Sequence, residues 1–454
     1  MPVEFERAVP ERELFPEHSS NYIRDERNPN RFQVNRRVFI SDEVLELERD
    51  RIFQRCWLYV GHASEVPKPG SFVTRTVAGQ PIIMTRDQEG QLRVWLNACT
   101  HRGAEVCRER QGTTRRFRCF YHSWSFSTDG RLVSLPDQEA FPEGFDTSDY
   151  SLRTPARVDS YRDFVFLNFD PDAMSLYDYL AGARQYLEIT ADQALTGMQV
   201  LPGTHEYSVR ANWKLLSENS YDGYHAIPVH KTYFDAQKLK GDDSLGDVQS
   251  EFKESGAYHL GNGHTVTVKH GPWARPVARW RPSMGPEAKP ILEASARRLE
   301  EHHGTEYADQ ICNLDFNMNI FPNLVINNIM AVIIRKYEPL RPDLMNVTAW
   351  SLAPREEDDG AKKVRNKSFL AFLGPAGLAT PDDNEALESV QRAAGRQGVE
   401  MWSDVSRGFD KDVPMNYDEM HMRTYWRHWD ALVTGRADVG DSLTNSESTE
   451  EVAP

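Results

Sequence analysis

The chain of 454 residues contains little cysteine and no long apolar run. Its five cysteines are sparse and odd in number, which argues against a framework of disulfides. No stretch approaches the roughly 18 consecutive apolar residues that a membrane span requires, so we expect no association with a membrane. The first residues also lack the basic and apolar regions of a signal peptide, and we therefore expect a cytoplasmic protein.

The chain also has fewer basic residues than acidic ones. The chain has 53 Lys and Arg against 68 Asp and Glu, a net charge of −15, and such a field disfavours binding to nucleic acid. Hydrophobic residues make up 39% of the chain, which is an ordinary globular composition. The length predicts about two to four domains.

The pattern of apolar residues divides the chain into four segments. Residues 1–37 are polar and predict an N-terminal arm that packs on the larger domain. Residues 38–155 are mainly short strands joined by turns and predict a small all-β domain. Residues 156–439 predict a larger domain with an antiparallel sheet flanked by helices, so the fold class is α+β. Residues 440–454, rich in Ser, Thr and Glu, predict a disordered tail.

Individual elements can also be expected from this pattern. A helix is predicted to begin after Ser41, a favourable N-cap residue. In the larger domain, the charged segment 354–367 predicts a loop and 368–373 a strand. Helices in that domain are also predicted over 212–240, 285–310, 381–405 and 416–434, and strands over 316–352.

Two Cys/His pairs in the smaller domain have the spacing of metal ligands. Cys99 and His101 form a C-x-H pair, and Cys119 and His122 form a C-x-x-H pair 17 residues later. A structural zinc site usually pairs Cys with Cys and His with His. One Cys and one His in each loop instead suit a Rieske [2Fe-2S] cluster, in which two Cys bind one iron and two His the other. Cys107 fits neither pair and is expected to be a buried core side chain.

A second group of polar residues lies in the larger domain. Asn219, Asp222 and His225 are three residues apart and share one face of a helix. His230 is five residues beyond His225, and Pro228 between them interrupts the helix, so that His230 can turn back toward His225.

Two histidines with a carboxylate and open coordination positions form the facial triad of non-haem Fe(II) oxygenases. His225 and His230 would supply the imidazoles. The acids close to them in sequence are Glu218 and Asp222.

The segments around both groups resemble the large (alpha, catalytic) subunit of Rieske aromatic ring-hydroxylating dioxygenases. The two Cys/His loops are similar to the Rieske motif of that family. Phe120 and Ser123 stand where many members have Pro and Gly, but neither is a ligand position. The resemblance extends over nearly the whole chain, including Asn212-Trp213-Lys214, Ile320-Phe321-Pro322-Asn323-Leu324 and the C-terminal helix.

The resemblance implies the remaining site residues. The family's iron carboxylate lies far downstream of its histidines, and the match places Asp383 on the iron, with Asp382 as the alternative. Asp222, grouped with Asn219 as catalytic, matches an acid that bridges an iron histidine, here His225, to a Rieske histidine of a neighbouring subunit. That partner histidine would correspond to His101 or His122.

The function implied is oxygen activation at a mononuclear Fe(II) fed with electrons by the Rieske cluster. The product would be a cis-dihydrodiol of an aromatic ring, and the stretch after Asp222 is closer to members that act on aromatic carboxylates. Monooxygenation or demethylation is the alternative. More distant alternatives are a zinc-stabilised binding protein and a Rieske ferredoxin. A ferredoxin would need only the small all-β domain, so about 300 further residues would have no role.

The expected partners follow from the same resemblance. No dinucleotide or flavin motif is present, so NADH or NADPH would act through a separate reductase, with or without a ferredoxin. A homotrimer, or an α3β3 assembly with a small β subunit, is expected. Six arginines and two glutamates lie between Cys99 and His122, which predicts either a basic docking face for the electron donor or ion pairs between subunits.

Overall fold

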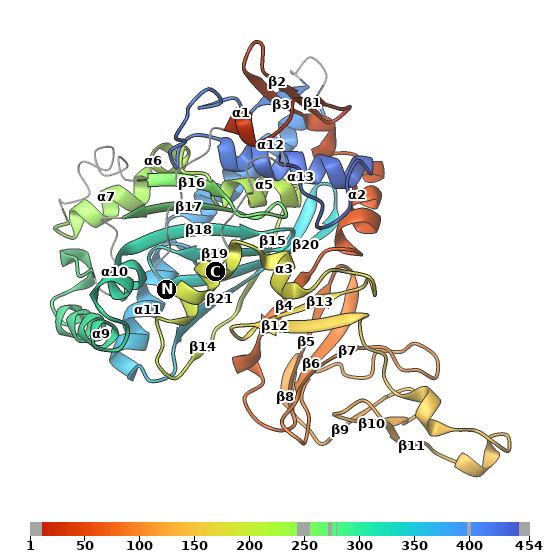
Figure 1. The fold of residues 1–454 in the computed structure, drawn as a ribbon. Coiled ribbons are helices and arrows are strands. Elements are labelled where there is room, and N and C mark those ends of the chain that lie inside the picture. Colours follow the sequence, from red (N-terminus) through yellow and green to blue (C-terminus); the bar gives the residue numbers. More distant parts are fainter. Residues whose placement is uncertain (1–10, 243–254, 271–274, 278, 397–400, 445–454) are drawn as a thin grey trace. The chain divides into compact units, whose positions relative to one another are not determined.

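The computed structural model describes residues 11–242, 255–270, 275–277, 279–396 and 401–444. It divides the chain into two compact units (Figure 1). One comprises Phe53–Leu176, and the other Met1–Ile52 together with Tyr177–Pro454. These bounds differ from the predicted domain boundaries at residues 38 and 155. The last residues of the predicted tail, 445–454, lie outside the described residues.

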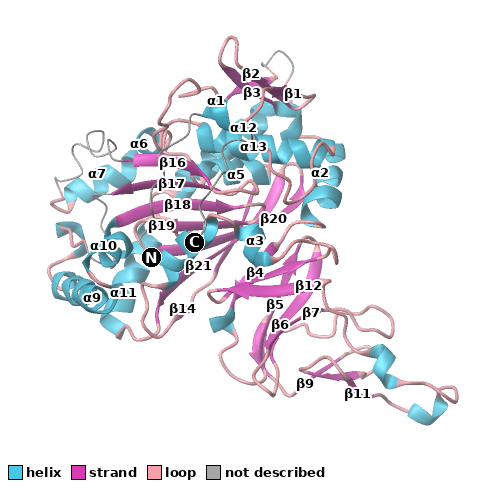
Figure 2. Ribbon diagram, in the orientation of Figure 1, coloured by secondary structure: helices cyan, strands magenta, loops and turns pink. Residues whose placement is uncertain are grey.

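The smaller unit is built from three antiparallel sheets (Figure 2), which confirms the prediction of a small all-β domain. Their strand orders are β7-β6-β5-β8, β11-β10-β9 and β12-β13-β4. The bounds are β4 Leu58–His62, β5 Ser71–Val77, β6 Gln80–Arg86, β7 Leu92–Leu96, β8 Gln111–Thr113, β9 Arg116–Arg118, β10 Ser125–Ser127, β11 Leu132–Ser134, β12 Arg157–Tyr161 and β13 Phe164–Asn168.

Strand pairing and one buried ion pair explain the two differences in the boundaries. Strand β13 pairs with β4, so the residues after 155 complete a sheet of the smaller unit. Helix α2, Asp42–Glu48, begins after Ser41 as predicted, and the Ser41 hydroxyl accepts a hydrogen bond from the Val44 N–H. At its end, the fully buried Glu48 pairs with Lys214 Nζ at 2.5 Å and so joins α2 to the larger unit. Both contacts are remote in sequence.

The larger unit is organised around an eight-stranded antiparallel sheet (Figures 1 and 2). Its order is β14-β21-β20-β19-β18-β17-β16, and β15 also pairs with β21. The bounds are β14 Met198–Val200, β15 His205–Val209, β16 Ser255–His259, β17 Thr265–His270, β18 Leu314–Ile320, β19 Leu324–Asn328, β20 Val332–Arg341 and β21 Leu344–Pro354. This sheet confirms the α+β class and the strands expected over 316–352.

Helices flank this sheet. Helix α13 packs against β16 and β17, α5 against β20, and α11 against β20 and β21. The bounds are α3 Leu176–Leu180, α4 Ala183–Ala191, α5 Trp213–Asn219, α6 Ala226–Val229, α7 Lys231–Leu239, α9 Ala288–His303, α10 Thr305–Asn313, α11 Asp359–Ala371, α12 Thr380–Ala394 and α13 Met420–Thr434. Each helix in the described part of the chain is too short or too polar to cross a membrane.

The N-terminal segment is more regular than an arm. Strands β1 His18–Ser19, β2 Ile23–Glu26 and β3 Arg31–Asn35 form a sheet with β22, Trp402–Asp404. Helix α13 lies against this segment. Its Arg423 pairs with Glu11 at 2.5 Å, and its Arg427 pairs with Asp25 at 2.6 Å. These buried ion pairs tie the segment to the larger unit.

The predicted loop over 354–367 and strand over 368–373 are wrong, because both belong mainly to helix α11. Asp358 caps this helix by accepting a hydrogen bond from the Ala361 N–H at 2.8 Å. The apolar residues at the end of α11 pack inward, because Phe369 and Phe372 belong to a buried hydrophobic cluster.

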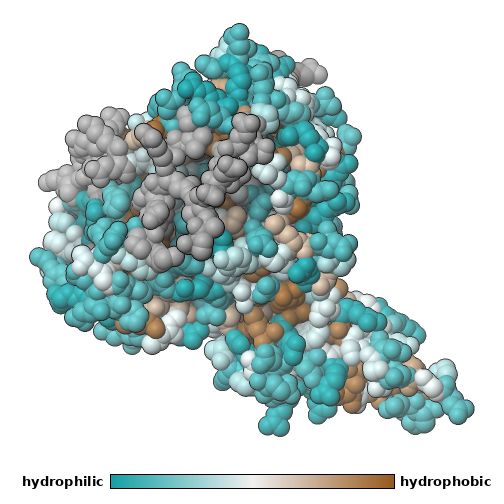
Figure 3. All heavy atoms as spheres, viewed as in Figure 1, coloured by the Kyte–Doolittle hydropathy of each residue, from teal (hydrophilic) through white to brown (hydrophobic). Residues whose placement is uncertain are grey.

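The other predicted helices of the larger unit are interrupted. The helix expected over 285–310 is divided at Gly304, which has φ +78° and begins α10 anew. The segment 212–240, for which an interruption at Pro228 is predicted, forms three helices, α5, α6 and α7. The helix expected over 381–405 ends at Ala394. In the view of Figure 3 most of the described surface is hydrophilic, as expected for a chain rich in charge.

Candidate metal centres

The elements after α5 carry both histidines of the second group. Helix α5 is capped by Asn212, whose side chain accepts a hydrogen bond from the Lys214 N–H, and it ends at Asn219. His225 precedes the single turn of α6, and His230 lies where α6 ends and α7 begins. Pro228 lies inside the turn of α6, so the predicted break falls at His230 instead, between α6 and α7. The two rings still lie together as predicted, with centroids 5.1 Å apart.

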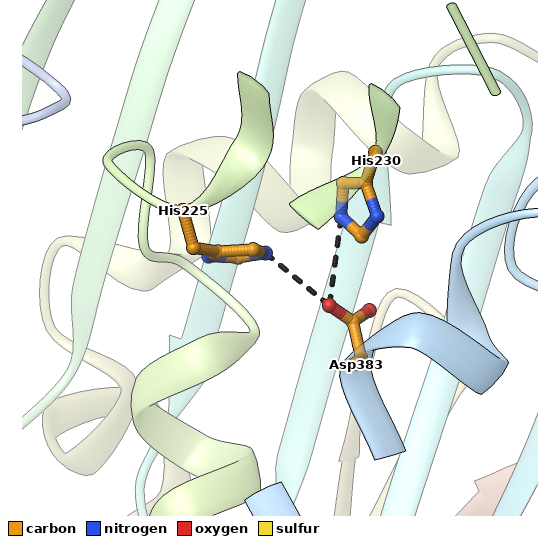
Figure 4. Close-up of side chains that lie close together, drawn as sticks. All are labelled: His225, His230 and Asp383. Carbon is orange, nitrogen blue, oxygen red and sulfur yellow. Dashed lines mark ion pairs between the residues drawn. The ribbon is translucent and has the colours of Figure 1, made fainter. Parts of the chain in front are cut away.

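Asp383 reaches this pair of histidines from the first turn of α12. Its Oδ1 lies 3.3 Å from His225 Nε2 and 3.5 Å from His230 Nε2 (Figure 4). Among the described residues, these three form a group whose possible ligand atoms all lie within 4.8 Å of one another. Asp382, the alternative acid, is not a member of this group.

Electrostatics in the group favour a cation. Burial lowers the pKa of His225, but hydrogen bonds with Asp222 and Asp383 outweigh it and raise this pKa to about 10. Burial raises the pKa of Asp383, but the contacts with His225 and His230 outweigh it and lower this pKa overall. A metal at the site would take the place of the proton on His225 Nε2, because a ligating imidazole must be neutral on that atom.

Two further side chains hold the ligand atoms in place. Asp222 Oδ2 lies 3.1 Å from His225 Nδ1, which fixes the ring with Nε2 toward Asp383. Asn219 Nδ2 donates to Asp383 Oδ1 at 3.1 Å and lies 3.3 Å from His225 Nε2. Glu218 points elsewhere, because its Oε1 accepts a hydrogen bond from Trp426 Nε1, and burial raises its pKa to about 8.

The donor set fits a mononuclear non-haem iron. Two imidazole nitrogens and one carboxylate lie close together, and a cavity opens beside all three residues. This leaves coordination positions for other ligands, whereas a structural zinc site would be closed by a fourth protein ligand.

The sequence predicts the strand Phe316-Asn317-Met318, together with Asn327 and Asn328, as walls of the substrate pocket. In the structure Phe316, Asn317 and Asn327 line the cavity beside the triad, whereas Met318 and Asn328 are not among its lining residues. The sequence reasoning missed other lining residues. They include Thr267, Lys269, Asp315, Arg335, Phe372 and Leu373. Arg335 and Lys269 lie in strands that also contain other polar or charged residues, such as Lys336 and Glu338 in β20, so the sequence carried no distinct local signal for them.

The two Cys/His loops of the smaller unit share one backbone pattern. The Cys99 and Cys119 N–H groups each donate to the carbonyl five residues on, both at 2.8 Å. Their carbonyls accept from Gly103 N at 2.8 Å and from Ser123 N at 3.0 Å. Gly103 has φ +77° and Ser123 has φ +61°, so both loops turn through the left-handed region. Gly adopts this conformation freely, and Ser123 adopts it at a cost of about 1 kcal/mol.

The side chains of these loops converge. Cys99 and Cys119 are buried and interact through their thiols, and burial raises the pKa of Cys99. The rings of His101 and His122 have centroids 4.6 Å apart, and His101 stacks on Trp124 at 4.7 Å.

These four side chains fit a two-iron cluster with a thiolate end and an imidazole end. His101 Nδ1 is buried and has no hydrogen-bond partner among the described residues, which leaves it available as a ligand. Cys107, buried and with its pKa raised by burial to about 11, is a core residue as expected.

Comparisons with known proteins agree with both centres. Residues 56–159 match the Rieske [2Fe-2S] domain, and residues 199–435 match the catalytic domain of the ring-hydroxylating alpha subunit. The 2-halobenzoate 1,2-dioxygenase large subunit of Burkholderia cepacia is 32% identical over 393 residues, 86% of this chain and 83% of that protein. The anthranilate 1,2-dioxygenase large subunit of Acinetobacter baylyi is 33% identical over 395 residues, 83% of this chain and 80% of that protein.

A solved structure extends this similarity to the fold. Naphthalene 1,2-dioxygenase from Rhodococcus sp., bound to indole, matches with a TM-score of 0.77 and 30% identity, covering 89% of this chain and 95% of that one. The chain therefore belongs to the Rieske ring-hydroxylating dioxygenase family as an alpha, catalytic subunit, an oxidoreductase that carries a [2Fe-2S] cluster and a non-haem iron and receives its electrons from a partner reductase.

Proposed function

We propose that this subunit dihydroxylates the ring of an aromatic carboxylate to a cis-dihydrodiol, as part of aromatic catabolism. When bound, the iron supplies oxygen activation and the cluster supplies electrons. The chain's own residues position the substrate, exclude water and hold the ligands. We assign Cys99, His101, Cys119 and His122 to the cluster, and His225, His230 and Asp383 to the iron.

Arg335 is the observation that supports a carboxylate substrate. Its side chain is only 3% exposed and lines the same cavity as the three proposed iron ligands. Its Nη2 donates to Ser220 Oγ and its Nε to Asn327 Oδ1, both at 3.1 Å, and both partners are neutral. Among the described residues no carboxylate forms an ion pair with it. A buried guanidinium without a neutralising acid suits an anionic ligand.

Lys269 is a weaker candidate for the same role. It stands directly opposite Asp315 in the pairing of β17 with β18, and its charge lowers the pKa of that acid against the larger effect of burial. The two relatives named above also favour this substrate class, since 2-halobenzoate and anthranilate are aromatic carboxylates.

A product screen tests the proposal. The purified protein, supplied with NADH and a surrogate reductase, would be offered benzoate, anthranilate and phthalate beside naphthalene and biphenyl. We expect a cis-dihydrodiol from at least one acid. Preference for a hydrocarbon over every acid would overturn the substrate class. A phenol or a demethylated product would instead support the monooxygenase alternative.

Replacement of Arg335 tests its proposed role directly. In Arg335→Gln we expect the Kd for benzoate to rise about 10- to 100-fold, because a charge-assisted hydrogen bond of about 1.5–3 kcal/mol is lost. Titration calorimetry measures this change, and binding of the neutral benzamide should change little. Arg341→Gln is the matched control, since Arg341 lies on the same strand but is exposed beside Asp343. Equal benzoate affinities in both variants would contradict the assignment.

We further propose that the electron donor, a reductase or a ferredoxin, docks beside the Cys/His loops. The six arginines of this window are all exposed, as are Phe120 (60%) and Tyr121 (57%). Exposed aromatic side chains within a basic patch are typical of an interface with an acidic protein. The same face could contact a neighbouring subunit in a homotrimer or an α3β3 assembly. The arginines are Arg102, Arg108, Arg110, Arg115, Arg116 and Arg118.

Charge reversal tests the proposed docking face. In the double variant Arg115→Glu, Arg116→Glu we expect cluster reduction by the donor to slow about tenfold at low salt, because electrostatic steering is lost. Stopped-flow absorbance measures this rate, and the cluster spectrum should not change. Arg131→Glu with Arg162→Glu carries the same charge change outside the window and is the control. A wild-type rate in the first variant would place the donor elsewhere.

A further inference from the structure

A second cavity lies beside the iron site in the larger unit. Its volume is about 340 Å³, within the range of small-molecule sites of about 300–1,000 Å³. One wall is a single face of α11, since its lining residues recur every three or four positions. These residues are Gly360, Lys363, Val364, Lys367, Ser368 and Ala371. Helix α7 and the start of α9 form the other walls.

The rim of this cavity is basic although the chain is acidic. Lys240, Lys363 and Lys367 line it and are exposed, and Glu287 is the single acid in its lining. Among the described residues, none of these three lysines forms an ion pair. The interior is apolar, with Met284, Ile291 and Val364 among its walls. An apolar interior below a rim of ammonium groups suits a molecule that has a ring at one end and an anion at the other.

Only a thin wall separates this cavity from the iron site. Met330 lines both cavities, and Tyr233 Oη lies 3.5 Å from Met330 Sδ. Phe234, the next residue of α7, lines the iron cavity, whereas Tyr233 lines the second one. Methionine is unbranched and has three rotatable side-chain bonds, so Met330 can change conformation and open the wall.

We propose that this cavity is an access chamber, which binds the aromatic carboxylate at its lysine rim and passes it by Met330 to the iron site. The inference rests on the proposed function for the charge of the substrate. The ring would lie on the apolar walls while Lys363 or Lys367 pairs with the carboxylate. Arg335 would then receive that carboxylate on the far side of Met330.

Charge reversal at the rim tests the chamber. In Lys363→Glu with Lys367→Glu, kcat/KM for benzoate should fall about tenfold at low salt, with kcat at saturation within about twofold. The control is Lys238→Glu with Lys362→Glu, which makes the same change in charge on α7 and α11, two helices that line the chamber, at positions outside its lining. Equal kcat/KM values in the two double variants would overturn the inference. If arenes but no aromatic acids are turned over, the proposed function fails instead.

A crystallographic experiment tests the chamber without turnover. Met330→Trp should close the wall, so that 4-bromobenzoate soaked into this variant gives an anomalous bromine signal in the chamber and none beside His225. The wild-type protein should show bromine at the iron site. Bromine beside His225 in the variant, with no signal in the chamber, would refute the route. The electron density for helices α7 and α11 in the same crystals shows whether the larger unit of the variant is folded.

Discussion

Asp222→Asn should retain both metal centres and yet lose turnover by about 100- to 1,000-fold, or roughly 3–4 kcal/mol in the barrier. The amide keeps the size of the carboxylate and can still accept a hydrogen bond from His225 Nδ1. The substitution removes the negative charge that would bridge His225 to a Rieske histidine of the neighbouring subunit. Iron analysis, cluster absorbance and steady-state turnover together measure the effect.

Glu419→Gln is the control for this variant. The charge of Glu419 raises the pKa of Glu218, and the charge of Asp222 raises the pKa of Glu419. Glu419 accepts a hydrogen bond from the Arg407 N–H and makes no contact with His225. Its replacement should change turnover by less than about threefold. Equal losses in both variants would show that general charge near the site, and not the bridge, controls turnover.

Mixed oligomers test whether the bridge crosses subunits. Asp222→Asn leaves the cluster intact, and His122→Ala leaves the iron site intact. If electrons pass between subunits, co-expression of the two chains should restore part of the activity, because some interfaces join an intact cluster to an intact Asp222. A route within one chain predicts no recovery. A monomer with full activity would also contradict the trimer that we propose.

The second large effect is expected at Asp383, the proposed iron carboxylate. Asp383→Ala should lose the mononuclear iron and reduce turnover by about 10,000-fold or more, while the cluster spectrum remains. Asp383 is buried and faces both histidines, and its removal leaves two neutral imidazoles, which bind Fe(II) weakly. Metal analysis and low-temperature EPR of the reduced cluster measure the two centres separately.

Asp382→Ala is a control one residue away. This side chain lies outside the group formed by His225, His230 and Asp383, so the variant should retain its iron and most of its activity. Loss of iron in Asp382→Ala and retention in Asp383→Ala would exchange the two assignments.

The local parts of both sites could be predicted from sequence because their residues are neighbours in the chain. Cys99 with His101, and Cys119 with His122, each lie in one tight loop whose backbone bonds fix the side chains. Asp383 is different. It meets the histidines only because α12 packs beside α5, and the resemblance to a family, not spacing, identified it.

The errors share one physical cause, which is that contacts remote in sequence override local pattern. The two compact units differ from the predicted domains because β13 pairs with β4 and Glu48 pairs with Lys214. The end of α11 looked like a strand because its inward face is apolar. Arg335 was missed because local pattern cannot show toward which side of a buried strand a charged side chain points.

Iron and acid-labile sulfide content tests the central claim that this chain carries a Rieske cluster and a separate mononuclear iron. The protein would be purified without oxygen, and metals would be measured by plasma mass spectrometry beside a colorimetric sulfide assay. We expect about three irons and about two sulfides per chain, with a brown colour. Zinc in place of iron, without labile sulfide, would contradict the account.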